Sequence, residues 1–181
     1  PADPLFRSRS KKNADNLVAF GRAFYEAKDT ANAKTYANYA LQVKKNNFAP
    51  AFILLGDIEV MADNGGNAAS YYDQAILADP KDDTAYRKYA LIYRKIDPRG
   101  AAEKLDQLKA ARPDIEVDAI KGHIYYISNK LGDAYDSYSK VPITKLDKSG
   151  LIEYSSLCFL TGHHADGLKA VELGVKENPQ I

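Results

Sequence analysis

The stretch that decides the fold is residues 49–82, which read APAFILLGDIEVMADNGGNAASYYDQAILADPKD. Apolar residues recur with a helical period on both sides of the central Asp63-Asn64-Gly65-Gly66, and Asp79-Pro80 follows the second half. A residue before proline is pushed out of the helical region, so a helix ends there. The pattern predicts two helices joined by a short turn, with Gly56 on the first and Ala68 on the second.

Gly56 and Ala68 belong to two columns of small residues that run through the chain. Twelve residues separate the members of a pair, and successive pairs are 35, 34, 32 and 33 residues apart. The pairs are Gly21 with Ala33, Gly56 with Ala68, Ala90 with Ala102, Gly122 with Ala134, and Ser155 with Gly167. Two antiparallel helices cross closely only where both carry little side chain. We therefore predict about five consecutive helical hairpins.

This register resembles the tetratricopeptide repeat (TPR) family, whose 34-residue unit has small residues at unit positions 8, 20 and 27 and aromatic residues at 11 and 24. Residues 49–82 match best, with Phe52, Gly56, Ala68 and Tyr72 in family register. The resemblance implies an all-α fold, a right-handed α-α superhelix of about five helix-turn-helix repeats in a TPR-type solenoid. The predicted units are 14–48, 49–82, 83–114, 115–147 and 148–181, after a basic N-terminal lead-in at 1–13.

The last two units depart from the pattern. The fourth has Val141-Pro142-Ile143 where its second helix would finish, so we expect that helix to be shortened or kinked. The fifth carries Gly167 and Gly174, and each interior glycine costs about 1 kcal/mol relative to alanine. We expect the fifth unit to be the least stable. The tyrosines at unit position 24, Tyr72 and Tyr138, are expected to lie in the core.

Composition narrows the classes of partner. Of 181 residues, 45% are hydrophobic and 27% charged, and the formal net charge is +1. This balance lacks the basic excess that binding a phosphate backbone needs, so we do not expect nucleic acid as a partner. No run approaches the roughly 18 apolar residues of a membrane span. The chain begins at Pro1 without an initiator Met, which favours an exported or periplasmic protein over a cytoplasmic one.

The cysteine and histidine residues, which could act as nucleophiles or metal ligands, are better explained as ordinary structural residues. Cys158 is the single cysteine and falls at an inward-facing position, so we expect burial rather than nucleophilic use. The adjacent His163 and His164 lack the i, i+4 spacing and the further ligands of a helical metal site. No nucleophile elbow, phosphate loop or dinucleotide fingerprint is found. We expect a protein that is not an enzyme and has no catalytic residue, metal or cofactor.

The resemblance also implies that the first helix of every hairpin lines a concave groove. Residues at groove-facing positions are the candidate partner-binding residues: Arg22, Tyr25, Asp57, Arg87, Leu91, Arg94, His123 and Tyr126. Some family members hold a peptide's terminal carboxylate in a clamp of lysine, asparagine and arginine. The matching positions here hold Val18, Arg22, Leu54, Thr84 and Lys88, so that clamp is absent in its usual form. Arg22, Arg87 and Arg94 either hold an acidic segment or pair with carboxylates such as Asp57.

The predicted function is a scaffold that binds a protein or peptide in this groove. One alternative is a structural or assembly component that acts through an array end or the convex face. Another is a regulatory portion of a longer enzyme or sensor. The last helix carries Leu168, Val171 and Val175 with no helix after it. The chain is therefore expected either to be a fragment of a longer array or to cover this C-terminal face by self-association.

Overall fold

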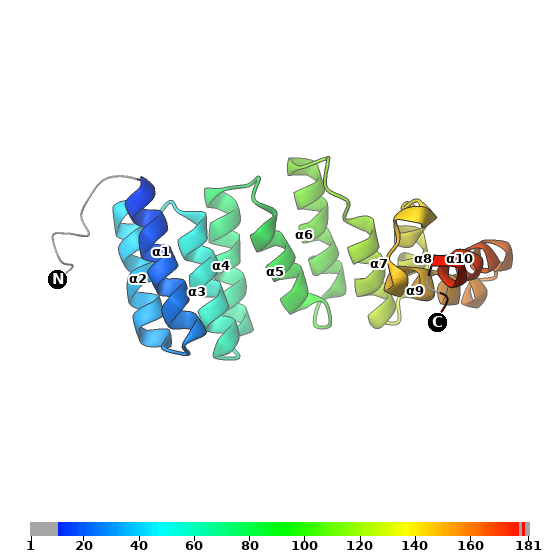
Figure 1. Ribbon diagram of the computed structural model, residues 1–181, viewed down its shortest axis with the longest axis horizontal. Coiled ribbons are helices and arrows are strands. Elements are labelled where there is room, and N and C mark those ends of the chain that lie inside the picture. Colours follow the sequence, from blue (N-terminus) through cyan, green and yellow to red (C-terminus); the bar gives the residue numbers. More distant parts are fainter. Residues whose placement is uncertain (1–10, 178, 180–181) are drawn as a thin grey trace. The chain divides into compact units, whose positions relative to one another are not determined.

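The computed structural model describes residues 11–177 and 179, and within them every regular element is helical (Figure 1). The predicted all-α fold is confirmed. The elements are α1 (Lys11–Glu26), α2 (Thr30–Val43), α3 (Ala49–Met61), α4 (Gly65–Ala78), α5 (Asp83–Tyr93), α6 (Pro98–Ala111), α7 (Asp118–Ile127), α8 (Leu131–Tyr138), the 3-10 turn η2 (Ile143–Lys145), α9 (Lys148–Leu160) and α10 (His164–Glu177). No helix in the described ranges is both long and apolar enough to cross a membrane.

The helices form two compact units, which divide between Ile92 and Tyr93 near the end of α5. The first holds α1 to α4 and most of α5, and the second holds α6 to α10. This boundary falls inside the predicted unit 83–114. Each compact unit has its own hydrophobic core.

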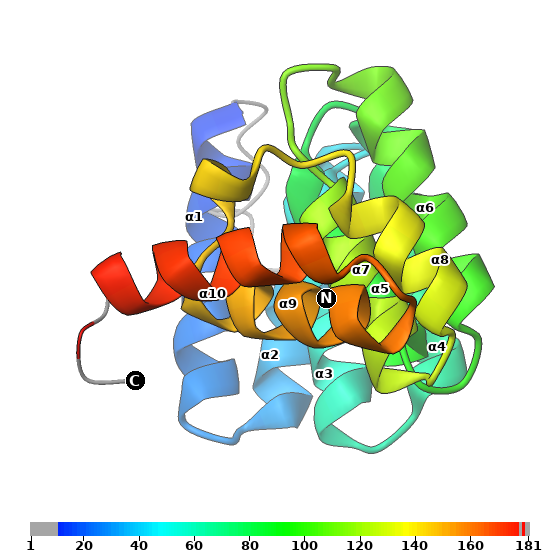
Figure 2. The same cartoon turned by 90° about the vertical axis from the view of Figure 1, so that its right-hand side faces the viewer.

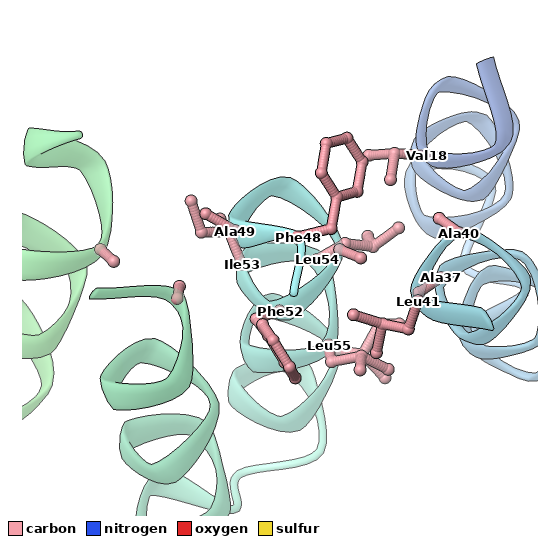
Figure 3. Packing of buried hydrophobic residues seen from close by; sticks show 14 of the residues in the cluster. Val18, Ala37, Ala40, Leu41, Phe48, Ala49, Phe52, Ile53, Leu54 and Leu55 are labelled. Carbon is pink, nitrogen blue, oxygen red and sulfur yellow. The ribbon is translucent and has the colours of Figure 1, made fainter. Parts of the chain in front are cut away.

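The core of the first unit is centred on α3. Helix α1 packs on α2, α3 packs on α4, and α2 joins the two hairpins by contact with α3. In Figure 3, Phe48 lies beside Val18, and Leu55 lies beside Leu41, in the space between the hairpins. Neighbours on several sides explain why the sequence of α3 is apolar nearly all round rather than along one stripe.

The core of the second unit lies between α7, α8, α9 and α10. Consecutive helices contact one another, and Figure 2 shows α9 and α10 side by side. Cys158 is fully buried in this core, as predicted, and burial raises the pKa of its thiol. Tyr138 is buried here and Tyr72 in the first core, so both tyrosines take the predicted place.

The break near Pro142 shapes the second unit. Helix α8 has only eight residues and ends at Tyr138, which confirms the predicted shortening. A proline has no N–H to donate and its ring clashes with the preceding helical turn, so α8 does not continue. Val141 and Leu146 are buried on either side of η2 and hold this segment against the core. The segment forms one wall of a cavity described below.

The two ends of the array are only partly described. Helix α1 begins at Lys11, so residues 11–13 of the predicted lead-in are helical, whereas residues 1–10 lie outside the described residues. At the other end α10 extends to Glu177, and Asn178 lies outside the described residues.

Candidate functional site

In each compact unit, a tyrosine on the second helix of a hairpin lies flat against a glycine on the first. The ring of Tyr72 covers Gly56, and the ring of Tyr138 covers Gly122. A Cβ atom at Gly122 would come within 2.6 Å of the Cδ2 atom of Tyr138, too close for any real contact. The absence of a side chain on the first helix lets each phenol reach past it to a carboxylate. These two carboxylates are the centres of the candidate sites.

In the first unit, the carboxylate is that of Asp57 on α3. The hydroxyl of Tyr72 donates to Oδ1 at 2.6 Å, and Nη1 of Arg22 donates to Oδ2 at 2.6 Å. Nζ of Lys88 lies 2.9 Å from Oδ1. Asp57 is only 5% exposed. These four residues, here called the Asp57 cluster, link the first helices α1, α3 and α5 through one buried charge.

The Asp57 cluster carries two positive charges and one negative charge. The side chains of Arg22 and Lys88 are each 35% exposed, so both cations reach the surface. A guanidinium has five N–H donors and an ammonium has three, which leaves donors beyond those directed at Asp57. Burial, and then the hydrogen bond to Asp57, raise the pKa of Tyr72, so its phenol stays neutral. The cluster is suited to holding a further carboxylate.

The other residues predicted to line the groove of the first unit are placed differently. Arg87 pairs with Asp83 one turn earlier on α5, with Nε and Oδ2 2.6 Å apart. Leu91 is exposed, whereas Tyr25 is partly buried against the core. Asp57 is buried beneath its cations instead of lining an open surface. The sequence left open whether the arginines bind an acidic segment or pair with carboxylates of the chain itself. Arg22 and Arg87 both form such ion pairs within the chain.

Lys88 is the functional candidate that sequence reasoning left out. It stands at a unit position where the clamp of the family carries a basic residue, which is the signal that points to it. Arg94 follows the end of α5 and belongs to the second unit, where its carbonyl accepts a hydrogen bond from Ser128 Oγ at 3.2 Å.

In the second unit, the carboxylate is that of Glu153 on α9. The hydroxyl of Tyr138 donates to Oε2 at 2.6 Å. Nδ1 of His123 lies 2.9 Å from Oε1 and 3.1 Å from Oε2. The side chain of Glu153 is 15% exposed and that of His123 is 49% exposed. Burial, and then the hydrogen bond to Glu153, raise the pKa of Tyr138. Tyr126, also predicted to line the groove, is partly buried against the second core.

A cavity of about 420 Å³ lies beside Glu153 and His123. It is bounded by α7, the end of α8, residues 145–147 at the end of η2 and after it, and the first turns of α9. Its lining residues are Ala119, Ile120, His123, Tyr138, Lys145, Leu146, Asp147, Ser149, Gly150 and Glu153. The carboxylate of Asp147 accepts from the backbone N–H of Gly150 and so caps α9. The cavity thus combines an apolar wall with polar groups.

A third feature is an apolar surface on the last hairpin, here called the α9–α10 face. Four of its apolar side chains are exposed to solvent: Ile152, Leu168, Val171 and Val175. A hollow of about 80 Å³ within it is lined by Lys148, Leu151, Ile152, Ser155, Ala170, Val171, Gly174 and Val175. At Gly174 a Cβ atom would meet nothing within 4 Å. The α9–α10 face is therefore an open apolar surface on the described part of the second unit.

The histidines near the start of α10 pack against aromatic rings. His163 stacks on Tyr135 with ring centroids 4.0 Å apart, and its Nδ1 lies 2.9 Å from Thr161 Oγ1. His164 lies against Phe159 with ring centroids 5.8 Å apart. Across the described part of the chain, His, Cys, Asp and Glu side chains do not gather in groups of three or more that would hold a metal ion.

Comparison with known proteins gives matches in structure alone. No protein-family model and no curated protein matches the chain. Among solved structures, MamA has a TM-score of 0.71 at 15% identity, over 92% of both chains. PilF of Pseudomonas aeruginosa has a TM-score of 0.69 at 17% identity, over 93% of this chain and 78% of its own. YrrB, described as a TPR protein with an unusual peptide-binding site, has a TM-score of 0.66 at 15% identity, over 94% of this chain and 89% of its own. At these identities the likeness concerns the fold.

Proposed function

Given that the chain has the tetratricopeptide repeat fold, we propose that it is a non-enzymatic scaffold that binds a protein or peptide on the first helices of its hairpins. The observation that carries this proposal is the Asp57 cluster, in which three first helices share one buried charge and direct two partly exposed cations outward. YrrB, which has the same fold, has a peptide-binding site, and this supports the same class of function.

The partner segment that fits the Asp57 cluster is acidic or ends in a free carboxylate. Arg22 and Lys88 outnumber Asp57, so a second carboxylate brings the local charge to balance. Hydrogen bonds from guanidinium and ammonium groups to a carboxylate are stronger than those between neutral groups. Their electrostatic energy increases where water is partly excluded, because the local dielectric constant is lower. This extends the predicted role of Arg22 and adds Lys88 to it.

Exposed apolar side chains on the same helices supply the second part of such a surface. Val60 on α3 and Leu91 on α5 are large hydrophobic residues open to solvent. Apolar anchors beside a few charged groups are the usual composition of an energetically important contact area. A segment with a carboxylate and neighbouring apolar residues would therefore use both features.

A binding function also agrees with the burial of the thiol and carboxylate groups that could otherwise take part in catalysis. The thiol of Cys158 is buried and its pKa is raised, which disfavours the nucleophilic thiolate. The carboxylates of Asp57 and Glu153 accept hydrogen bonds from buried tyrosines.

Binding of defined peptides to the purified chain tests the proposal. A random peptide library is screened first, and the dissociation constants of enriched peptides are then measured by fluorescence anisotropy. We expect enrichment of peptides with acidic residues or a free C-terminal carboxylate, and amidation of that terminus should weaken binding by about tenfold. Failure to enrich any peptide, or enrichment of basic peptides on the first unit, would contradict the proposal.

The variants are chosen to remove the cations without leaving a buried charge unpaired. The triple variant Arg22→Gln, Asp57→Asn and Lys88→Gln removes the charge of the whole Asp57 cluster and should lose binding of the acidic peptide. Lys176→Gln on α10 is the matched control, because Lys176 is an exposed lysine outside the first unit. If the triple variant keeps the helical circular dichroism of the parent and still binds the acidic peptide normally, the Asp57 cluster is not the binding site.

A second candidate function is assembly through the α9–α10 face. Its specific support is the set of exposed apolar residues that includes Ile152, Val171 and Val175, together with the hollow beside Gly174. A second copy of the chain is the occupant that we propose for this face, and its test is given in the Discussion.

A further inference from the structure

The two carboxylates that accept from buried tyrosines differ in how their charge is balanced. Asp57 forms ion pairs with an arginine and a lysine, Arg22 and Lys88. Glu153 is met by His123, which is charged only if protonated. Within the described residues, no lysine or arginine lies within ion-pair distance of Glu153. When the imidazole is neutral, Glu153 thus holds a largely buried negative charge without an opposite charge.

Glu153 also has room for further hydrogen bonds. An ionised carboxylate offers about four acceptor positions on its two oxygens. The hydroxyl of Tyr138 occupies one position on Oε2, and Nδ1 of His123 is shared between Oε1 and Oε2. A planar guanidinium or an ammonium arriving from the cavity side therefore finds unused acceptor positions.

The cavity beside Glu153 has the volume and lining for a long cationic side chain. Its volume is about 420 Å³, and Ala119, Ile120 and Leu146 form apolar lining against which methylene groups pack. Asp147 adds a second carboxylate to the lining. Lys145 lines the cavity too, but no ion pair joins it to Glu153 in the part of the chain that the structure describes.

We propose that this cavity binds the lysine or arginine side chain of a peptide segment of the partner, with the cationic head on Glu153 and the methylene stem against Ile120 and Leu146. This inference rests on the proposed scaffold function and deepens it. The first unit would receive an anionic group on Arg22 and Lys88, whereas the second would receive a cationic group on Glu153. The two sites of opposite charge lie in separate compact units, so each is tested by itself.

The test uses small probes of one side chain. N-acetyl-L-arginine N-methylamide, the corresponding lysine compound, and the uncharged citrulline compound are titrated into ¹⁵N-labelled full chain, and backbone amide shifts are followed. We expect saturable shifts at Ala119, Ile120 and Gly150 with the two cationic probes. Citrulline has nearly the shape of arginine without its charge, so it should bind about tenfold more weakly.

Glu153→Gln is the decisive variant, because the amide oxygen still accepts from the hydroxyl of Tyr138 while the charge is lost. We expect it to weaken binding of the arginine probe by about tenfold or more. Glu172→Gln, on the exposed side of α10, removes one negative charge from the same unit and should leave binding unchanged. Equal binding of citrulline and arginine, normal binding by Glu153→Gln, or shifts confined to other residues would overturn the inference.

The failure of this inference is distinguishable from failure of the proposed function. If acidic peptides bind the first unit but cationic probes do not shift the amides around Glu153, the cavity assignment alone is wrong. If the cationic probes bind as expected but no acidic peptide binds, the cavity stands and the assignment of the Asp57 cluster is wrong.

Discussion

The ring of Tyr138 lies against Gly122 so closely that a Cβ atom there would come within 2.6 Å of Cδ2. The same tyrosine donates its hydroxyl to Glu153 at 2.6 Å. Tyr72 makes both kinds of contact in the first unit, with Gly56 and with Asp57. One residue thus joins the close crossing of a hairpin to the polar site beside it. The stability of the fold and the geometry of the candidate sites are therefore coupled.

Replacing Gly122 with alanine should destabilise the second unit. The added methyl group would collide with the ring of Tyr138, and overpacking of this kind costs about 1 to 3 kcal/mol. Gly174→Ala is the matched control, because Gly174 lies inside α10 and open space surrounds its Cβ position. That change should instead stabilise by about 0.5 to 1 kcal/mol, since alanine has the better helix propensity. Urea unfolding measures both, and equal effects of the same sign would contradict the expected packing.

Tyr72→Phe should lower the free energy of unfolding by about 1 to 3 kcal/mol, because Asp57 loses one donor inside a buried site. The phenyl ring keeps its packing on Gly56, so the change isolates the hydroxyl. Tyr71→Phe on the same helix is the control, since within the described residues the hydroxyl of Tyr71 makes no hydrogen bond. Identical urea midpoints for the two variants would show that the bond to Asp57 contributes nothing.

Stability should fall in alkali. Burial is the main cause that raises the pKa of Tyr72 and Tyr138, and it raises the pKa of Tyr154 to about 12. A phenol whose pKa is higher in the folded state is neutral there at a pH where the unfolded chain already ionises. Its contribution to stability is therefore complete below about pH 10, the ordinary tyrosine pKa, and is lost as pH rises through the folded value.

Absorbance of tyrosinate and helical circular dichroism, followed together during the titration, measure this effect. Exposed tyrosines should ionise first, and the buried ones should ionise only as the helical signal falls. Titration of all 13 tyrosines in a single phase, with the helical signal intact, would mean that burial does not raise the pKa of Tyr72, Tyr138 and Tyr154.

Self-association through the α9–α10 face should be visible in the mass of the purified chain. We expect light scattering to show a dimer that grows with concentration, and Val171→Asp to abolish it by placing a charge on the apolar surface. Leu77→Asp, at an exposed leucine of α4 in the other unit, should leave the dimer intact. A wild-type chain that stays monomeric at its highest soluble concentration would rule out the second copy as occupant.

Hydrogen exchange should find the last hairpin less protected than the second. Each repeat unit is stabilised by contacts with its neighbours. The α9–α10 face leaves apolar side chains of the last hairpin exposed, whereas α3 in the second hairpin is packed on several sides. Amides of residues 148–177 should therefore exchange faster than those of residues 49–78. Equal protection in the two ranges would show that the glycines and the open surface do not weaken the last hairpin.

Much of the fold was predictable because its cause is local. A small residue on each helix of a pair is needed wherever two backbones approach closely, and Ala33, Ala68 and Ala134 are all fully buried at such crossings. Pro142 likewise ends α8 through its own covalent structure. Signals of this kind can be read from spacing without knowledge of any distant contact.

The candidate sites were only partly predictable, since they depend on contacts between helices far apart in sequence. The sequence placed Arg22 and Asp57 among the groove residues, and the structure joins them across 35 positions. It pointed to Arg87, yet Lys88 reaches Asp57 while Arg87 bonds one turn back to Asp83. Neighbouring residues on a helix differ by about 100° in direction, so the orientation of α5 about its own axis decides which of the two reaches Asp57.

By itself, the sequence determined that this protein is a series of helical hairpins, with small residues at their crossings and Tyr72 and Tyr138 in the core. Only the tertiary structure decided what each phenol meets. Tyr72 reaches Asp57 within its own hairpin, whereas Tyr138 reaches Glu153 on the first helix of the next. The glycine pairing is enforced by sterics inside one hairpin, but the choice of carboxylate depends on how α7 and α8 pack against α9. That packing leaves Glu153 beside a cavity, whereas in the first unit the packing of α1, α3 and α5 brings Arg22 and Lys88 onto Asp57.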